Sequence, residues 1–176
     1  MMIRRVLTNR PSSKSSRQDG GNKADSGTGS AYWITPVRGD DLHPVEQVVK
    51  NWVVEKGIYA IGARTPGRRE MTSGDWLCFY AVRKGIVGHA QIAKPAEFNP
   101  AETSAFYPYI LRLGLRTTYT HDPVILDDKK RSELDAFAGP RGYKNLGFFV
   151  QATHRITEHD FRHLTRESKD RPRHHP

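Results

Sequence analysis

The spacing of apolar residues between positions 31 and 165 divides the chain into strands and helices. The segment AYWITPV, Ala31 to Val37, combines aromatic and β-branched residues and predicts a short opening strand. The next apolar residues recur at helical spacing and predict a helix that ends at Gly57. The apolar face of that helix consists of Val45, Val48, Val49, Trp52 and Val53. One side of the helix should therefore pack on a sheet.

A β-hairpin is the clearest prediction in the middle of the chain. Ser73-Gly74-Asp75 is a turn signal that leads into an apolar strand from Trp76 to Val82. Arg83-Lys84-Gly85 then turns the chain back into a second strand from Ile86 to Ala93. These two strands should pair antiparallel.

Three further segments complete the expected core of the fold. The stretch YPYILRLGLR, residues 107–116, predicts a strand whose beginning Pro108 keeps at a sheet edge. The charged run DDKKRSELDAF, residues 127–137, predicts a weak helix. The stretch GFFVQATHR, residues 147–155, is interpreted as a last strand.

A closing helix follows, because Thr157 is a good N-cap and Phe161 and Leu164 then face inward. The total is five or six strands and about three helices, with strands in the middle and helices around them. This arrangement favours an α+β fold built on a curved, mostly antiparallel sheet or an incomplete β-barrel.

The two ends of the chain differ in composition from the part between them. Residues 1–30 are mostly Ser, Gly, Asp, Asn, Lys and Arg, so we expect a disordered basic tail there. Six Lys or Arg against two Asp give this tail a charge of +4. It either adds nonspecific affinity for phosphate or is a solvated extension, including one from an upstream start codon. Residues 31–165 form the expected single domain, and residues 166–176 should fray.

The charge of the chain indicates the class of its partner. The formal net charge is +9 and the pI is about 9.8, which favours a polyanion, nucleic acid before membrane. No apolar run has the length of a membrane span, so no membrane partner is expected. Cys78 is the only cysteine, which excludes an intramolecular disulfide and fits a core thiol in a cytoplasmic protein. The oligomeric state stays open.

An aromatic residue beside a cluster of cations marks the segment from Lys56 to Ala93. Tyr59 follows a glycine turn, and Arg64, Arg68 and Arg69 come shortly after it on a Pro-Gly loop. An aromatic face can stack on a nucleobase, and arginine forks suit phosphate. Two simpler interpretations stay open: Tyr59 is a core tyrosine with its hydroxyl on a backbone carbonyl, and the arginines form a solvated loop.

Candidate catalytic residues are scattered and incomplete. His159 and His163 have the spacing of a metal-binding pair, but two ligands leave a zinc site unfinished. His121-Asp122 resembles half of a base and its orienting group, and Asp127-Asp128 with Glu133 fits a charged helix face better than a nuclease. We therefore predict no catalytic residues, no metal and no cofactor.

Five short motifs follow one another along the chain: Tyr32-Trp33-Ile34, Gly57-Ile58-Tyr59, Ser73-Gly74-Asp75, the run Ile86 to Ala90, and Phe148-Phe149. In this order they resemble the EVE domain, a member of the PUA-like superfamily and a relative of the YTH domain. The resemblance covers roughly residues 32–165 and is nearest to the compact single-domain prokaryotic proteins. The chain departs from the commoner pattern at Tyr59, where relatives carry tryptophan, and in the following run AIGARTPGRRE.

The resemblance implies a PUA-like fold with a pocket that takes a flipped-out, often modified base into a partial aromatic cage. Tyr59 aligns with the cage tryptophan of the YTH turn, and Tyr107 or Tyr109 lies near the second cage aromatic. The implied pocket residues are Tyr59, Tyr107, Tyr109, Thr35 and Ala60. The implied phosphate-binding residues are Arg38, Arg64, Arg68 and Arg69, whereas Trp33 is expected in the core.

The sequence therefore favours a module that binds DNA or RNA and recognises a modified base. Two alternatives remain: an enzyme of nucleic-acid or nucleotide modification with the same architecture, and a protein-interaction domain whose pocket is vestigial. The residues do not distinguish DNA from RNA, and they do not name the modification.

Overall fold

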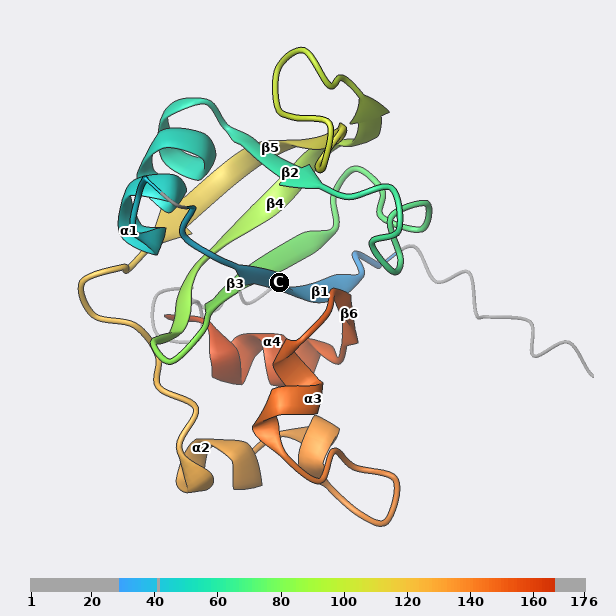
Figure 1. Ribbon diagram of the computed structural model, residues 1–176. Helices are drawn as coiled ribbons and strands as arrows, with labels where there is room; N and C mark the ends of the chain where they lie inside the picture. The colour runs from blue at the N-terminus through green and yellow to red at the C-terminus, as the bar shows by residue number, and fades with distance from the viewer. Residues whose placement is uncertain (1–28, 41, 167–176) are drawn as a thin grey trace, which may run out of the picture.

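A computed structural model describes residues 29–40 and 42–166 of the chain (Figure 1). The predicted basic tail and the predicted C-terminal tail lie almost wholly outside these residues. Within the described part, no helix has the length and apolar character needed to cross a membrane.

The fold is α+β, with one six-stranded mixed sheet flanked by short helices, as the sequence predicts (Figure 1). The strand order is β2-β5-β4-β3-β1-β6, and the sheet does not close into a barrel. All neighbours pair antiparallel except β1 and β3, which are parallel. The strands are β1 (Tyr32–Val37), β2 (Ile58–Ile61), β3 (Trp76–Ala81), β4 (Gly85–Phe98), β5 (Tyr109–Thr118) and β6 (His154–Ile156). The helical segments are α1 (Val45–Val48), η1 (Val49–Glu55), α2 (Asp128–Ser132), η2 (Asp135–Phe137), α3 (Leu146–Val150) and α4 (Glu158–Leu164).

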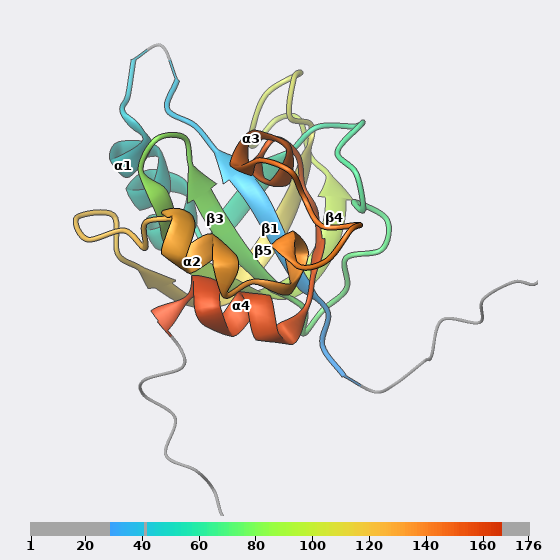
Figure 2. The ribbon, with the colours of Figure 1, turned by 90° about the horizontal axis from the view of Figure 1, so that it is seen from below.

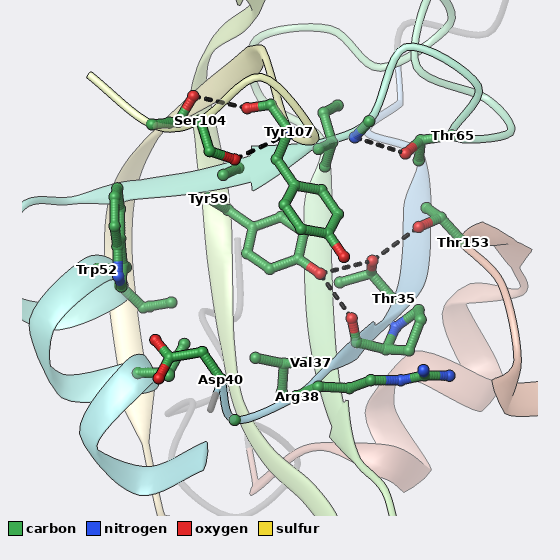
Figure 3. A pocket seen from close by; sticks show the side chains of 18 of the residues that line it. Thr35, Val37, Arg38, Asp40, Trp52, Tyr59, Thr65, Ser104, Tyr107 and Thr153 are labelled. Carbon is green, nitrogen blue, oxygen red and sulfur yellow. Dashed lines mark hydrogen bonds between the residues drawn. The ribbon is translucent and has the colours of Figure 1, made fainter. Parts of the chain in front are cut away.

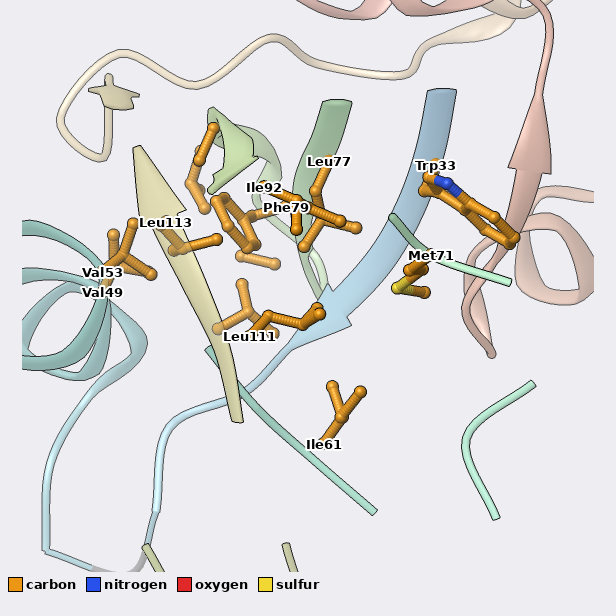
Figure 4. Close-up of a cluster of buried hydrophobic side chains, with 14 of the residues drawn as sticks. Trp33, Val49, Val53, Ile61, Met71, Leu77, Phe79, Ile92, Leu111 and Leu113 are labelled. Atoms are coloured by element: carbon orange, nitrogen blue, oxygen red, sulfur yellow. The ribbon is translucent and has the colours of Figure 1, made fainter. Parts of the chain in front are cut away.

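Strand β3 is buried on both faces, which explains its unbroken apolar run WLCFYA. Alternate side chains of β3 enter two separate cores, because successive residues of a strand point to opposite faces. The first core lies between the sheet and α1 and η1, and the second lies under α3 and α4 (Figures 1 and 2). The first core includes Trp33, Val49, Val53, Met71, Leu77, Phe79, Leu111 and Leu113 (Figure 4). The second core includes Ile34, Cys78, Tyr80, Phe149, Phe161 and Leu164.

The predicted hairpin is confirmed as β3 and β4, which pair antiparallel around a turn at residues 82–84. Arg83 takes a positive φ of 64° and Gly85 one of 108°, the backbone conformations that reverse the chain here. β4 continues past the hairpin to pair with β5, and the register between β4 and β5 shifts three times. Such irregularities bend and twist strands, so β4 carries the curvature of the sheet.

A buried carboxylate holds β1 beside the start of β3. Asp75 accepts hydrogen bonds from the backbone amide of Ala31 at 2.9 Å, the indole of Trp33 at 3.1 Å and the backbone amide of Thr72 at 3.0 Å. Trp33 itself is buried in the first core, as predicted. The turn motif at residues 73–75 therefore connects two strands that are far apart in the sequence.

The strand predicted over residues 147–155 is wrong, because the segment begins as a helix and enters a strand only at His154. Residues Leu146–Val150 form α3, and only His154–Ile156 form a strand. The side chain of Asn145 accepts from the backbone amide of Phe148 at 3.1 Å and caps the helix. This cap, together with burial of Phe149 and Val150 on one helical side, outweighs the β propensity of the run FFV.

The other helices follow the predictions with local changes. The first helix begins as α1 and continues as a seven-residue π-helix, η1, before Gly57 takes a φ of +64°. The weak helix over residues 127–137 is divided into α2 and η2. The closing helix α4 is confirmed, with the Thr157 hydroxyl accepting from the amide of Asp160 at 3.0 Å.

His89, on β4, makes the stability of the fold depend on pH. Its ring is 4 % exposed and lies among Trp76, Tyr119 and Phe161, and burial lowers its pKa to about 4 from 6.5. The unfolded chain therefore binds a proton at this site between these pH values while the native protein does not. Stability should fall by about 2 to 3 kcal/mol as the pH drops from neutral to about 4.5.

Urea unfolding at both pH values measures this loss. His89→Gln should reduce the loss, although His154, whose pKa burial also lowers, leaves part of it in place. An acid-dependent loss of the same size in His89→Gln as in the wild type would contradict the assignment.

Candidate functional site

A cavity of about 570 Å³ opens between the end of β1, the helix η1, the strand β2 and the loop at residues 99–108 (Figure 3). Cavities of this size suit a small organic group such as a nucleobase. The lining includes aromatic rings, short hydroxyls, two charged side chains, and aliphatic side chains such as those of Val37, Val48 and Ile61. We call it the aromatic cavity, after Trp52, Tyr59 and Tyr107.

The three aromatic side chains come from three different elements. Trp52 projects from η1, Tyr59 from β2 and Tyr107 from the loop before β5 (Figure 3). Tyr59 is half-buried and packs against Phe79 of the first core, with ring centroids 5.2 Å apart. Tyr107 is 56 % exposed and therefore stands at the mouth. The arrangement offers aromatic faces to a flat ligand from more than one side.

A chain of hydroxyls fixes the inner end of Tyr59. Its hydroxyl donates to the carbonyl of Pro36 at 2.7 Å and lies 3.1 Å from the Thr35 hydroxyl, which is 2.7 Å from that of Thr153. Burial raises the pKa of Tyr59 to about 12, and Tyr107 adds to the rise while the bond to Thr35 opposes it. Tyr59 is therefore a rigid neutral wall. Its hydroxyl lies on a backbone carbonyl, as the simpler interpretation expects, and its ring also lines the cavity.

Trp52 reaches the cavity from a π-helix. A π-helical segment is rare, and such segments occur frequently at functional sites. The ammonium group of Lys56 lies 4.0 Å from the Trp52 ring centre, which keeps one side of the indole occupied by a cation. The sequence placed Trp52 on the packing face of the helix, so its place in the cavity was missed.

The loop that carries Tyr107 is held in place by an ion-pair network. Arg112 on β5 bonds to Glu97 at 2.9 Å and to Glu102 at 2.7 Å. Within the loop, the Thr103 hydroxyl donates to the carbonyl of Tyr107 at 2.6 Å. Tyr107 is thus exposed but its backbone is anchored.

Arg38 and Asp40 line the cavity just beyond β1 (Figure 3). The Asp40 carboxylate accepts from the amides of Leu42 at 2.9 Å and His43 at 2.7 Å. The hydrogen bond from Leu42, followed by the side chain and amide of His43, holds the pKa of Asp40 below its usual range. Arg38 is exposed and forms no ion pair with a described residue, so its guanidinium can meet an anionic group at the mouth.

Among the expected pocket residues, Thr35, Tyr59, Ala60 and Tyr107 are brought together in the lining, whereas Tyr109 lies outside it. The strand predicted over residues 107–116 begins only at Tyr109, so Tyr107 lies in the preceding loop and the two tyrosines do not share a strand. The Tyr109 ring instead packs against the Phe98 ring, with the two ring centroids 5.4 Å apart, and lies under the guanidinium of Arg68. Thr35 is buried and already hydrogen-bonded, so it orients Tyr59 more than it offers a free hydroxyl.

The three arginines after β2 do not line the aromatic cavity. Arg68 lies 3.7 Å above the Tyr109 ring and is half-buried. Arg64 and Arg69 are exposed and have no ion pair among the described residues. The loop itself lies close to the core, since a Cβ added at Gly67 would come 2.3 Å from the Trp33 ring.

The other titratable clusters have structural roles. Both oxygens of the buried Asp160 carboxylate accept hydrogen bonds from backbone amides, one from Asp135 at 2.6 Å and one from Ala136 at 3.0 Å. His159 Nδ1 lies 3.5 Å from Asp135 and 3.6 Å from Asp160, and these are the groups most able to hold a metal within the described chain. Cys78 is buried, and burial raises the pKa of its thiol, as expected of a core cysteine.

The acidic run at the start of α2 pairs with its own helix. Asp127 accepts from the amide of Lys130 at 2.7 Å and caps the helix, and Lys130 bonds to Glu133 at 2.9 Å. Asp128 pairs with Arg131. The prediction of a charged helix face is therefore confirmed here.

Comparison with known proteins does not assign the chain to a family. No protein-family model matches it, and no curated protein matches it. Among solved structures, it is similar to the NMR structure of Rpa0253 from Rhodopseudomonas palustris, at 17 % identity over 76 % of this chain and 90 % of that one, with a TM-score of 0.42. It is also similar to the crystal structure of Atu2648 from Agrobacterium tumefaciens, at 16 % identity over 80 % and 94 % of the two chains, with a TM-score of 0.43. Nothing about function follows from likeness at this level.

Proposed function

We propose that this protein is a nucleic-acid-binding module that holds a flipped-out, modified base in the aromatic cavity. The observation that carries the proposal is the convergence of Trp52, Tyr59 and Tyr107 on one cavity of about 570 Å³. A base stacked on an aromatic ring gains about 1 to 3 kcal/mol, and a methyl group adds apolar contact. The resemblance of the sequence motifs to the EVE domain points the same way.

The charges of the molecule support a nucleic-acid partner. The net charge of +9 favours a polyanion, and Arg38 stands at the cavity mouth without an ion-pair partner among the described residues. A cation there can contact the phosphate of the strand from which the base is extruded. The cavity then supplies selectivity, and the charge supplies general affinity.

The titratable groups of the cavity support a binding role over catalysis. The described lining residues include one carboxylate, that of Asp40. It already accepts hydrogen bonds from two backbone amides, and its pKa lies below its usual range. The Tyr59 hydroxyl stays protonated and donates to a backbone carbonyl. Neither group is poised to take a proton from a ligand near neutral pH. Catalysis on the same base remains the alternative.

Binding of short oligonucleotides tests the proposal. Single- and double-stranded probes carrying cytosine, methylcytosine, hydroxymethylcytosine or methylated adenine should bind the wild type with different affinities. Tyr107→Ala should weaken the tightest of these complexes by roughly 5- to 150-fold and reduce discrimination, because it removes one stacking wall. Phe106→Ala is the matched control, since Phe106 is a neighbouring aromatic, 86 % exposed, that does not line the cavity.

Phe106→Ala should bind every probe as the wild type does. Equal affinity of the wild type for all probes, unchanged in Tyr107→Ala, would leave only charge-driven binding and refute the base-binding proposal. Turnover of a probe to a new base would instead establish the catalytic alternative.

A further inference from the structure

A second cavity adjoins the aromatic cavity on the side of α3. It has a volume of about 560 Å³ and lies between the loop at residues 141–144, the end of α3 and Pro66. Gln151 and Thr153 line both cavities, so the two are neighbours along one surface. A ligand that fills the first cavity and continues as a chain can therefore enter the second.

The second cavity is bordered by cations without counter-charges. Arg141 and Lys144 line it, are exposed, and form no ion pair with a described residue. Pro66 brings the arginine loop to the opposite edge, between the exposed Arg64 and Arg69. An anion placed here would meet the positive charge of Arg141 and Lys144.

Aromatic side chains form the rest of the wall. Tyr143 is held by ring contacts to Phe149 at 5.3 Å and to His154 at 5.6 Å. Phe148 lines the same cavity and is 58 % exposed, so its ring is accessible to a ligand there. Together they offer a flat apolar surface beside the cations.

An orphaned acceptor lies at the same place. His154 Nδ1 is 3.0 Å from the carbonyl of Ala152, which can only accept, so Nδ1 carries the hydrogen. The other nitrogen, Nε2, is therefore an acceptor, and it is buried with no hydrogen-bond partner among the described residues. With Nε2 buried, His154 packs against Tyr143 and Phe149, with ring centroids 5.6 Å and 5.2 Å away, and so supports the apolar wall of the cavity.

We infer that the second cavity holds the nucleotide next to the base in the aromatic cavity. Its phosphate lies on Arg141 and Lys144, and its base lies against Tyr143 and Phe148. A nucleotide unites the two features that this lining calls for, an anion and a flat ring. The inference rests on the proposed function, because the first cavity fixes the strand that the second cavity continues.

Salt titration of a double variant tests this inference. The probe is a short single-stranded oligonucleotide carrying whichever of the four bases, cytosine, methylcytosine, hydroxymethylcytosine or methylated adenine, the wild type binds tightest. Log affinity falls as log salt rises. In the variant Arg141→Ala with Lys144→Ala this fall should be less steep, by about 0.7 in slope for each phosphate that the protein no longer neutralises. The control, Lys94→Ala with Lys129→Ala, removes the same charge from exposed lysines on β4 and α2 and should leave the slope nearer to that of the wild type.

Two further measurements separate this inference from the proposed function. Discrimination among bases should persist in the Arg141 and Lys144 variant, because the aromatic cavity is intact. Phe148→Ala should weaken binding of the oligonucleotide and leave binding of the free modified nucleoside unchanged. A slope equal to that of the control pair, with discrimination intact, would overturn the second subsite and leave the first standing. Absence of discrimination in the wild type would overturn the proposed function instead.

Discussion

Replacing Trp52 and Tyr107 together by alanine is expected to weaken binding of the preferred modified oligonucleotide by at least about 2 kcal/mol, roughly 30-fold. Each ring contributes a separate aromatic face to the cavity, one from η1 and one from the loop before β5. The loss should be larger for the modified probe than for its unmodified counterpart, because charge-driven binding persists. Fluorescence anisotropy with labelled oligonucleotides measures both affinities.

The matched control for this variant is Phe98→Ala with Phe106→Ala. Both phenylalanines are exposed, at 66 % and 86 %, and neither lines the aromatic cavity. The control should bind both probes with nearly wild-type affinity. A control that loses as much affinity as the Trp52 and Tyr107 variant would show that exposed aromatic residues in general, and not this cavity, hold the nucleic acid.

Asp75→Ala is expected to destabilise the fold by about 3 to 5 kcal/mol. The substitution leaves the indole of Trp33 and the amides of Ala31 and Thr72 without their acceptor. The Trp33 indole is buried in the first core, so no water replaces the missing bond without rearrangement. Urea unfolding gives the loss of stability as a shift of the midpoint.

Asp127→Ala provides the comparison. Asp127 is also a carboxylate that accepts a hydrogen bond from a backbone amide, that of Lys130, but it is exposed and caps the short helix α2. Its removal should cost about 1 kcal/mol. Equal losses of stability in the two variants would mean that burial of Asp75 contributes nothing to its effect.

The sheet and its central hairpin could be predicted from local sequence alone. The turn residues Arg83-Lys84-Gly85 have a short sequence signature, β3 before them is a continuous apolar run, and β4 after them begins with the largely apolar segment GIVGHA. The parallel pairing of β1 with β3 could not be seen in this way. It depends on long-range contacts such as that of Asp75 with Trp33, which no local pattern records.

The candidate site was predicted only in part, because local sequence patterns do not show which residues of a helix line a cavity. Tyr59 stood out because it follows a glycine turn, whereas Trp52 belongs to a regular apolar spacing that a packing face would also produce. The change from α-helix to π-helix alters the direction in which side chains leave the helix. The second cavity was missed because the segment FFV was interpreted as a strand, although Asn145 is a suitable cap three residues before Phe148.

The most direct test of the aromatic cavity follows the three indole N–H resonances of the protein by NMR. Trp33 donates to Asp75 inside the first core, Trp76 lies in the second core, and Trp52 lines the cavity. On titration with the preferred modified oligonucleotide, the Trp52 resonance should shift and saturate while those of Trp33 and Trp76 stay nearly fixed. The unmodified oligonucleotide should shift Trp52 much less. An unmoved Trp52 resonance at saturating modified oligonucleotide would contradict a base held in the aromatic cavity.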